Sequence, residues 1–96
     1  MYGDEELRKA SRVLKALSNV VRLKILLMLA ETERPLHIEA VARNLGMDYG
    51  AVYRHVKVLK EARLLKVYEV GRSRVLSPTN MELVKQFIEH AKAIAK

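Results

Sequence analysis

The chain has 96 residues, of which 18 are Lys or Arg and 11 are Asp or Glu, giving a net charge of +7 at pH 7. This length fits one domain, and a chain that is 50% hydrophobic has too much apolar surface to stay disordered. Because there is no cysteine, disulfides, thiolate zinc sites and cysteine nucleophiles are excluded, and the basic charge favours nucleic acid as a partner over an acidic membrane surface or an acidic protein.

The N-terminal residues do not resemble a targeting signal. Residues 4–6 are acidic, where a signal peptide would be basic and then apolar. The longest apolar run, residues 25–30, is far too short to cross a bilayer. We therefore expect a cytoplasmic protein.

Two helices are predicted at the start of the chain, over residues 4–17 and about 20–31. The first has acidic residues in its first turn, where the helix dipole favours them, and apolar residues at intervals of three and four. The side chain of Asn19 can cap the second helix. Since the second helix is apolar on nearly every side, it is expected at the centre of the core.

The following residues have the spacing of a helix-turn-helix. After a brief strand at Leu36, a third helix is predicted to begin near His37 and to end at Gly46, a residue that adopts the left-handed conformation without strain. Asp48 then stands where its side chain can cap a fourth helix, over about residues 48–62. Two helices joined by so short a turn form the unit that places its second helix in a DNA groove.

The fourth helix has an apolar inward face and a polar outward face. The outward face carries the candidate DNA contacts Tyr49, Gly50, Tyr53, Arg54 and Lys57. Arg54 suits a guanine edge and Lys57 a phosphate, whereas the alternative is an ordinary solvated helix face. The tyrosine hydroxyls suit phosphates, although either ring could instead pack on a neighbouring element. Gly50 weakens a helix, which indicates either a close approach to DNA or a tight contact within the turn.

From residue 65 the apolar pattern changes to a period of two, which predicts a hairpin with strands at 65–70 and 74–77. Arg72 and Arg74 are expected at its tip, where they suit a DNA minor groove or its flanking phosphates. The alternative is a charged turn that keeps the hairpin soluble. Residues 49–77 hold seven Lys and Arg against two carboxylates, so this window alone carries net +5 of the chain's +7.

A last helix is predicted over about residues 81–95, with an apolar stripe like that of the first helix. The second, third and fourth helices already supply the core of a small domain, so the two stripes are expected to join two copies of the chain. Residues 1–96 then form a single DNA-binding domain whose terminal helices, about 4–17 and 80–95, make the dimer interface. The expected interface residues are Leu7, Val13, Leu14, Val84, Phe87, Ile88, Ala91 and Ile94.

Three segments together resemble the ArsR-type winged helix-turn-helix transcription regulators. Residues 16–26, ALSNVVRLKIL, are similar to that family's opening, residues 45–62 resemble its turn and recognition helix, and residues 71–74, GRSR, resemble its wing tip. The resemblance implies a mainly α (α+β) fold of about five helices with a two-stranded β-hairpin wing. It also implies a homodimer that binds operator DNA as a repressor.

The metal-binding positions of that family are not reproduced here. Metal-sensing members often carry Cys-x-Cys at the start of the third helix, where this chain has His37 and Glu39, and the last helix offers only the adjacent Glu89 and His90. We therefore predict no metal site, no cofactor and no metal response. His55, at the edge of the recognition helix, is expected to be partly buried and hydrogen-bonded.

These observations predict a sequence-specific, double-stranded-DNA-binding transcription regulator, expected to be a homodimeric repressor with a palindromic operator. Residues 48–62 would occupy the major groove, and residues 65–77 would lie on the minor groove or on phosphates. The alternative is a winged-helix module whose basic face binds RNA or an acidic protein partner. An enzyme is disfavoured because the chain has no HExxH motif, phosphate-cradling glycine loop or catalytic carboxylate pattern.

Overall fold

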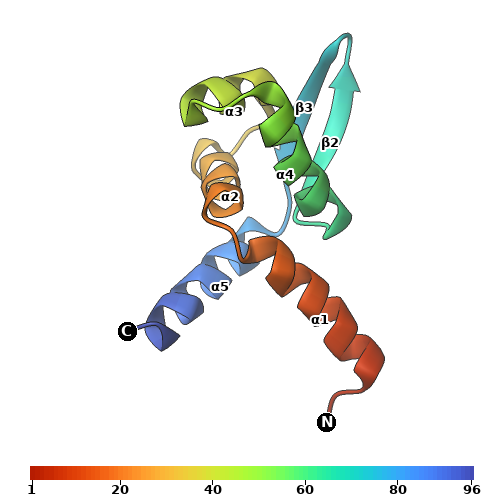
Figure 1. Ribbon diagram of the computed structural model, residues 1–96, viewed down its shortest axis with the longest axis vertical. Helices are drawn as coiled ribbons and strands as arrows, with labels where there is room; N and C mark the ends of the chain where they lie inside the picture. Colours follow the sequence, from red (N-terminus) through yellow and green to blue (C-terminus); the bar gives the residue numbers. More distant parts are fainter.

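The computed structural model describes residues 1–96 and contains five helices and a three-stranded antiparallel sheet. The helices are α1 (Asp4–Leu17), α2 (Val20–Thr32), α3 (Ile38–Leu45), α4 (Tyr49–Glu61) and α5 (Met81–Ile94). The strands are β1 (Leu36–His37), β2 (Leu65–Val70) and β3 (Ser73–Pro78). The expected mainly α (α+β) winged-helix fold is confirmed (Figure 1). β1 adds a third strand to the two-stranded wing.

The sheet has the strand order β1-β3-β2, so β3 lies in the middle. β2 and β3 form the wing hairpin, in which Val70 pairs with Ser73 across a two-residue turn. Gly71 opens this turn with φ of +62°, a conformation that glycine adopts without steric cost. On its other side β3 pairs with β1, where Leu36 lies opposite Leu76. The short β1 strand thus fastens the start of α3 to the middle of β3.

The helix ends agree with the predicted capping residues in two cases and differ in one. Asn19 accepts a hydrogen bond from the backbone N–H of Arg22 at 3.1 Å, as expected of an N-cap. Gly46 ends α3 with φ of +65°. Asp48 occupies the N-cap position of α4, but its exposed side chain makes no capping hydrogen bond, so that part of the prediction was wrong.

The core is one hydrophobic cluster with α2 at its centre. Ile25, Leu26 and Leu29 of α2 are fully buried, and α2 contacts α1, α4, α5 and β3. The helix is not covered on every side, however, because Val20 in its first turn is 67% exposed. No polar or charged residue is buried, so the interior is stabilised by apolar packing.

The terminal helices lie at the end of the molecule opposite the wing. α1 and α5 leave the body there and diverge from each other, and both chain ends lie on that side (Figure 1). Neither these helices nor the other three combine the length and apolar character needed to cross a membrane. The molecule therefore has two separate candidate functional surfaces. One is the basic end formed by α4 and the wing, and the other is formed by α1 and α5.

Candidate nucleic-acid interface

The outward face of α4 is open to solvent, as the helical period predicts. Arg54 and Lys57 are exposed, whereas Val52 and Val56 on the opposite face are fully buried. The three ion pairs of the structure involve neither Arg54 nor Lys57. Both cationic groups are therefore free to contact a partner.

Gly50 lies on this face and is not required by the protein's own packing. A Cβ atom placed there would have only the Arg54 Nη1 atom within 4 Å, at 3.9 Å. A tight contact within the turn therefore does not account for the glycine.

Tyr49 and Tyr53 form a cluster with two residues of the wing. Their rings stack with centroids 6.4 Å apart and planes at 21°. The Arg74 guanidinium carbon lies 4.4 Å from the centre of the Tyr53 ring, and Arg74 Nη1 donates a hydrogen bond to Tyr49 Oη at 2.8 Å. Arg74 Nε lies 3.9 Å from Glu69 Oε1. We call Tyr49, Tyr53, Glu69 and Arg74 the wing–helix cluster.

The position of Arg74 corrects the expectation that it stands at the wing tip. It is the second residue of β3, and its side chain reaches back to the first turns of α4. Only Arg72 occupies the exposed turn itself. The hydrogen bond to Tyr49 raises the pKa of Arg74 further, so the guanidinium stays charged. Glu69 was not predicted, although it lies directly opposite Arg74 in the hairpin register, a pairing that strand alternation can indicate.

His55 is partly buried and hydrogen-bonded, in agreement with its expected role. Its Nδ1 atom lies 3.3 Å from Arg22 Nη1. Arg22 also donates to the backbone carbonyls of Ala16 at 2.7 Å and Lys15 at 3.3 Å, in the last turn of α1. Burial, and then the charges of Arg22 and Arg54, lower the pKa of His55, so a neutral ring accepts the bond from Arg22. Arg22, which sequence reasoning missed, therefore ties α1 to α4.

His37 and Glu39 meet at Ser73, the first residue of β3, next to the turn of the wing. His37 Nδ1 lies 2.7 Å from Ser73 Oγ, and Ser73 Oγ donates to Glu39 Oε1 at 3.2 Å. Since the serine hydroxyl has one proton and gives it to Glu39, His37 Nδ1 is the donor to Ser73. The positions that carry cysteines in metal-sensing relatives here fasten the start of α3 to β3. No group of three His, Asp or Glu side chains is close enough to hold a metal ion.

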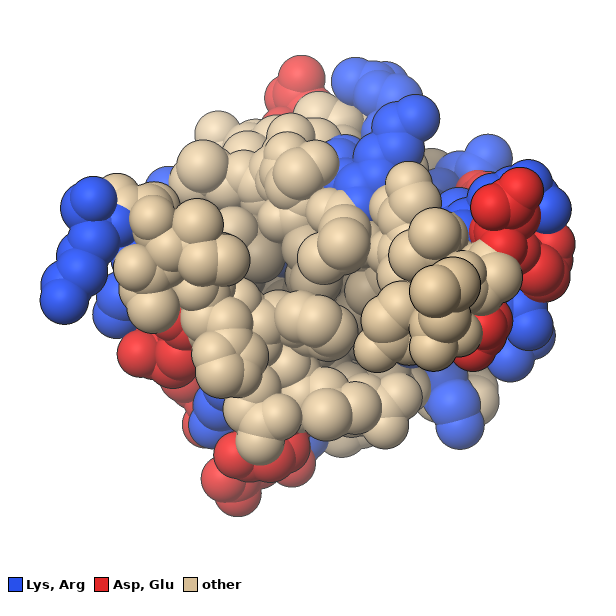
Figure 2. All heavy atoms as spheres, turned by 90° about the horizontal axis from the view of Figure 1, so that it is seen from below, with Lys and Arg blue, Asp and Glu red and all other residues tan.

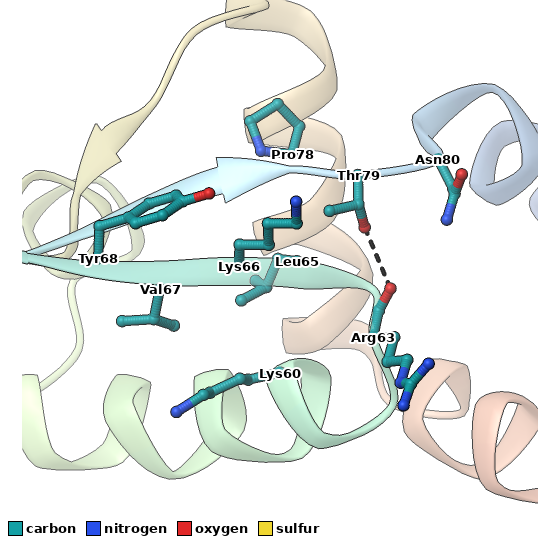
Figure 3. Close-up of a pocket in the computed structure, with 9 residues that line it drawn as sticks. All are labelled: Lys60, Arg63, Leu65, Lys66, Val67, Tyr68, Pro78, Thr79 and Asn80. Carbon is teal, nitrogen blue, oxygen red and sulfur yellow. Dashed lines mark hydrogen bonds between the residues drawn. The ribbon is translucent and has the colours of Figure 1, made fainter.

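A hollow of about 710 Å³ lies between the end of α4, β2 and the start of α5. Lys60, Arg63 and Lys66 line it, but their side chains run in different directions and their charged ends do not converge (Figure 3). Thr79 Oγ1 donates to the carbonyl of Arg63 at 3.1 Å and so joins the turn after α4 to the residues before α5 (Figure 3). The hollow extends the basic surface rather than enclosing one ligand.

The face formed by α1 and α5 is largely uncharged. Figure 2 shows uncharged side chains across the middle of this end of the molecule, with charged groups mainly at its edge. An apolar cleft of about 420 Å³ lies between the two helices, lined on one side by Leu14 and on the other by Phe87. These two side chains are 54% and 43% exposed. Such a surface is typical of a protein interface.

Four of the eight expected interface residues, Leu14, Phe87, Ile88 and Ala91, line this cleft, and Leu7 and Ile94 are exposed further along the same two helices. Val13 lines a different hollow, beside Glu61 and Ala62 at the end of α4. Val84 is 1% exposed and belongs to the core of the single chain, because the first turns of α5 pack on α2. Val13 and Ile88 are partly buried against the core and keep part of their surface outside. The exposed residues are Leu7, Leu14, Phe87, Ala91 and Ile94.

The comparison with protein families gives one match, the HVO_A0114 family, over residues 16–76. This range runs from the end of α1 through the helix-turn-helix to the wing, and covers most of the chain. The chain belongs to the HVO_A0114 family. A comparison with curated protein sequences gave no significant match for this HVO_A0114-family protein.

Solved structures similar to this chain include a possible ArsR-family regulator and other transcriptional regulators. A possible ArsR-family regulator from Mycobacterium bovis, described as a homodimeric winged helix-turn-helix DNA-binding domain, is 26% identical, with 99% of this chain and 88% of that chain covered and a TM-score of 0.76. A transcriptional regulator homologue from Pyrococcus horikoshii is 29% identical, with 92% and 94% covered and a TM-score of 0.74. The antimony-specific repressor AntR is 25% identical, with 95% and 86% covered and a TM-score of 0.72.

These likenesses confirm the resemblance to ArsR-type winged helix-turn-helix regulators that the sequence indicated. These three structures cover 92% to 99% of the HVO_A0114-family chain. The similar proteins are described as transcriptional regulators rather than enzymes.

Proposed function

We propose that this chain is a homodimeric transcription repressor that binds a palindromic operator in double-stranded DNA. The observation that carries the proposal is the exposed face of α4, where Arg54 and Lys57 have no acidic partner beside a glycine that the protein's own packing does not require. Unpaired cationic side chains on a helix of this kind serve both phosphate attraction and base reading. The descriptions of the similar structures as regulators support the same function.

In the proposed complex α4 enters the major groove. Arg54 would donate two hydrogen bonds to a guanine edge, Lys57 would contact a phosphate, and Gly50 would let the backbone approach the DNA closely. The Tyr49 hydroxyl would donate to a phosphate, and the uncovered edge of Tyr53 would pack on sugar or on a thymine methyl group. Arg72 in the wing turn would lie on the minor groove or its flanking phosphates.

Residues 1–96 would act as one domain, and two copies would join through α1 and α5. The uncharged face of these helices supports this arrangement, as does the homodimeric state of the similar mycobacterial domain. Two-fold symmetry would then present two copies of α4 about one DNA turn apart. The repressor role rests on the described role of AntR, and the site of action would be the cytoplasm.

Selection of bound sequences from a random duplex pool at a stated salt concentration tests this function. We expect enrichment of a motif with two inverted half-sites, because a symmetric dimer reads the same bases twice. A structured RNA pool and an acidic peptide serve as competitors for the alternative partners. Failure to enrich any duplex sequence, or tighter binding to the RNA or the peptide, would contradict the proposal.

A further inference from the structure

We propose that Arg74 is a positioning residue of the DNA interface. It stays bound within the protein, sets the wing against the recognition helix, and directs the Tyr49 hydroxyl toward a DNA phosphate. This inference rests on the proposed DNA-binding function. It departs from the simpler view that every arginine of the wing contacts DNA.

The first argument is that the Arg74 guanidinium makes three different contacts at once. Nη1 donates to Tyr49 Oη at 2.8 Å, the planar face covers the Tyr53 ring at 4.4 Å, and Nε faces Glu69 at 3.9 Å. These contacts join three elements, α4, β2 and β3. A planar fork with donors on several edges can make all of them together, whereas the single ammonium of lysine cannot.

The second argument concerns the proton of the Tyr49 hydroxyl. Arginine has donors but no acceptor, so Tyr49 Oη must be the acceptor of the Arg74 bond. The hydroxyl's own proton is then left to donate elsewhere, and no other side-chain partner of Tyr49 is present. The charged donor also polarises the hydroxyl, which strengthens the bond that the hydroxyl donates in turn. A phosphate oxygen, which only accepts, has the chemistry to receive it.

The third argument concerns the reach of the wing. The hairpin is a two-stranded ribbon beyond its pairing with β1, and such a ribbon has little stability of its own. Arg74 holds this ribbon to the first turns of α4, two residues from Arg72 in the turn. Where Arg72 reaches on the DNA therefore depends on the contacts of Arg74 on the α4 side, together with the hydrogen bonds of Ser73 to His37 and Glu39 on the α3 side. Loss of the Arg74 side chain should therefore free the wing from α4, rather than remove one phosphate contact.

The matched pair Arg74→Gln and Arg72→Gln tests the inference, because each variant removes one positive charge from the wing. Affinity is measured against salt for the selected operator and for an unrelated duplex. Arg72→Gln should lower the slope of log affinity against log salt by about 0.9 per protomer and weaken both duplexes alike. Arg74→Gln should leave the slope near the wild-type value and reduce the preference for the operator about tenfold or more.

Two further variants separate positioning from general damage. Tyr49→Phe should weaken both duplexes without lowering the salt slope, because the tyrosine is uncharged, and adding it to Arg74→Gln should cost little further affinity, since both remove the same hydrogen bond. Arg74→Lys should keep the charge and the slope but still lose preference. A slope in Arg74→Gln that falls as far as in Arg72→Gln, while hydrogen exchange in the wing stays unchanged, would overturn the inference, because it would show that Arg74 contacts phosphate itself.

A measurement without DNA keeps this test separate from the proposed function. In the free protein, amide hydrogen exchange in the outer wing, residues 69–74, should be faster in Arg74→Gln than in Arg72→Gln or wild type. Unchanged exchange in Arg74→Gln would overturn the positioning role even where DNA binding is strong. Absence of duplex binding by the wild-type protein would overturn the proposed function, while the exchange result would still decide whether Arg74 holds the wing.

Discussion

Arg54 and Lys57 lie less than one turn apart on α4, yet the proposed interface gives them different tasks. Arg54→Ala should cost about 1–3 kcal/mol of binding free energy and relax discrimination at one base pair per half-site. Lys57→Ala should weaken all duplexes alike and lower the salt slope by about 1. Binding isotherms on the operator and on single-base variants measure both effects. Unchanged binding by the double variant would show that α4 is not the reading helix.

Gly50 offers a test in which stability and binding should change in opposite directions. Gly50→Ala should raise the free energy of unfolding by about 0.5–1 kcal/mol, because alanine favours a helix and the added methyl group has room. The same methyl group should weaken operator binding several-fold if the backbone approaches DNA there. Gly46→Ala is the control, since its φ of +65° makes any side chain strained and destabilising. Stronger or equal operator binding by Gly50→Ala would contradict the proposed contact.

His55 should make the stability of the fold depend on pH. The pKa of His55 is lowered from its ordinary value of 6.5 in the folded chain, so the unfolded chain takes up this proton first as pH falls. Stability from the neutral ring is therefore complete above about pH 6.5 and is lost as the pH falls through the lowered pKa.

The variant His55→Asn keeps an acceptor for Arg22 but cannot be protonated. Its melting temperature should fall less than that of wild type between about pH 7.5 and pH 5.5. His90→Asn, on the exposed surface of α5, is the matched control and should follow wild type. Parallel melting curves for His55→Asn and wild type would contradict the lowered pKa.

Which side chains are exposed on α4 could be predicted from the helical period alone, and the structure agrees for Arg54 and Lys57. The internal partners of Arg74 and His55 could not. Arg74 and Tyr49 are 25 positions apart, and Arg22 and His55 are 33 apart. A charged residue near a turn predicts a solvated side chain, and only the packing of the hairpin on α4 shows that Arg74 turns inward.

At the scale of the elements, the local rules of helix capping and strand alternation were sufficient to place every helix and both wing strands. The differences arise where a tertiary contact adds to the local signal. The brief strand at Leu36 was predicted, but its pairing with β3 was not, and Val84 leaves the expected interface because α5 begins against α2. The apolar stripe of α5 did not show which of its residues belong to the core and which to the outer face, because both groups follow the same helical periodicity.

The two N-caps of α2 and α4 should differ in their contribution to stability. Asn19→Ala should lower the free energy of unfolding by about 1 kcal/mol, because it removes the hydrogen bond to the Arg22 amide. Asp48→Ala should cost only a few tenths of a kcal/mol, since no capping hydrogen bond is lost and only the charge near the helix dipole changes. Urea unfolding of both variants measures the difference. Equal losses would show that the Asn19 bond is not what stabilises the start of α2.

At the scale of the whole molecule, the basic surface and the uncharged surface lie at opposite ends. Phe87→Glu places a charge in the apolar cleft beside α1 and should split the proposed dimer while leaving the core folded, because Phe87 is 43% exposed. Sedimentation at micromolar concentration measures the oligomeric state, and circular dichroism checks the fold. Val70→Glu, at an exposed position of the wing, is the control for added charge. A wild-type monomer that still binds its operator tightly would contradict the dimer.

The two hydrogen-bonded links to α4 have a consequence for the DNA itself. Arg22 joins α4 to the last turn of α1, and Thr79 joins the turn after α4 to the start of α5, so both helices of the proposed interface are connected to the reading helix. In a dimer built this way, each reading helix has a set rotation about the operator axis. DNA completes a turn in about 10–10.5 base pairs. The affinity of such a protein would depend on the helical angle between the two half-sites, and so on DNA twist, as well as on their bases.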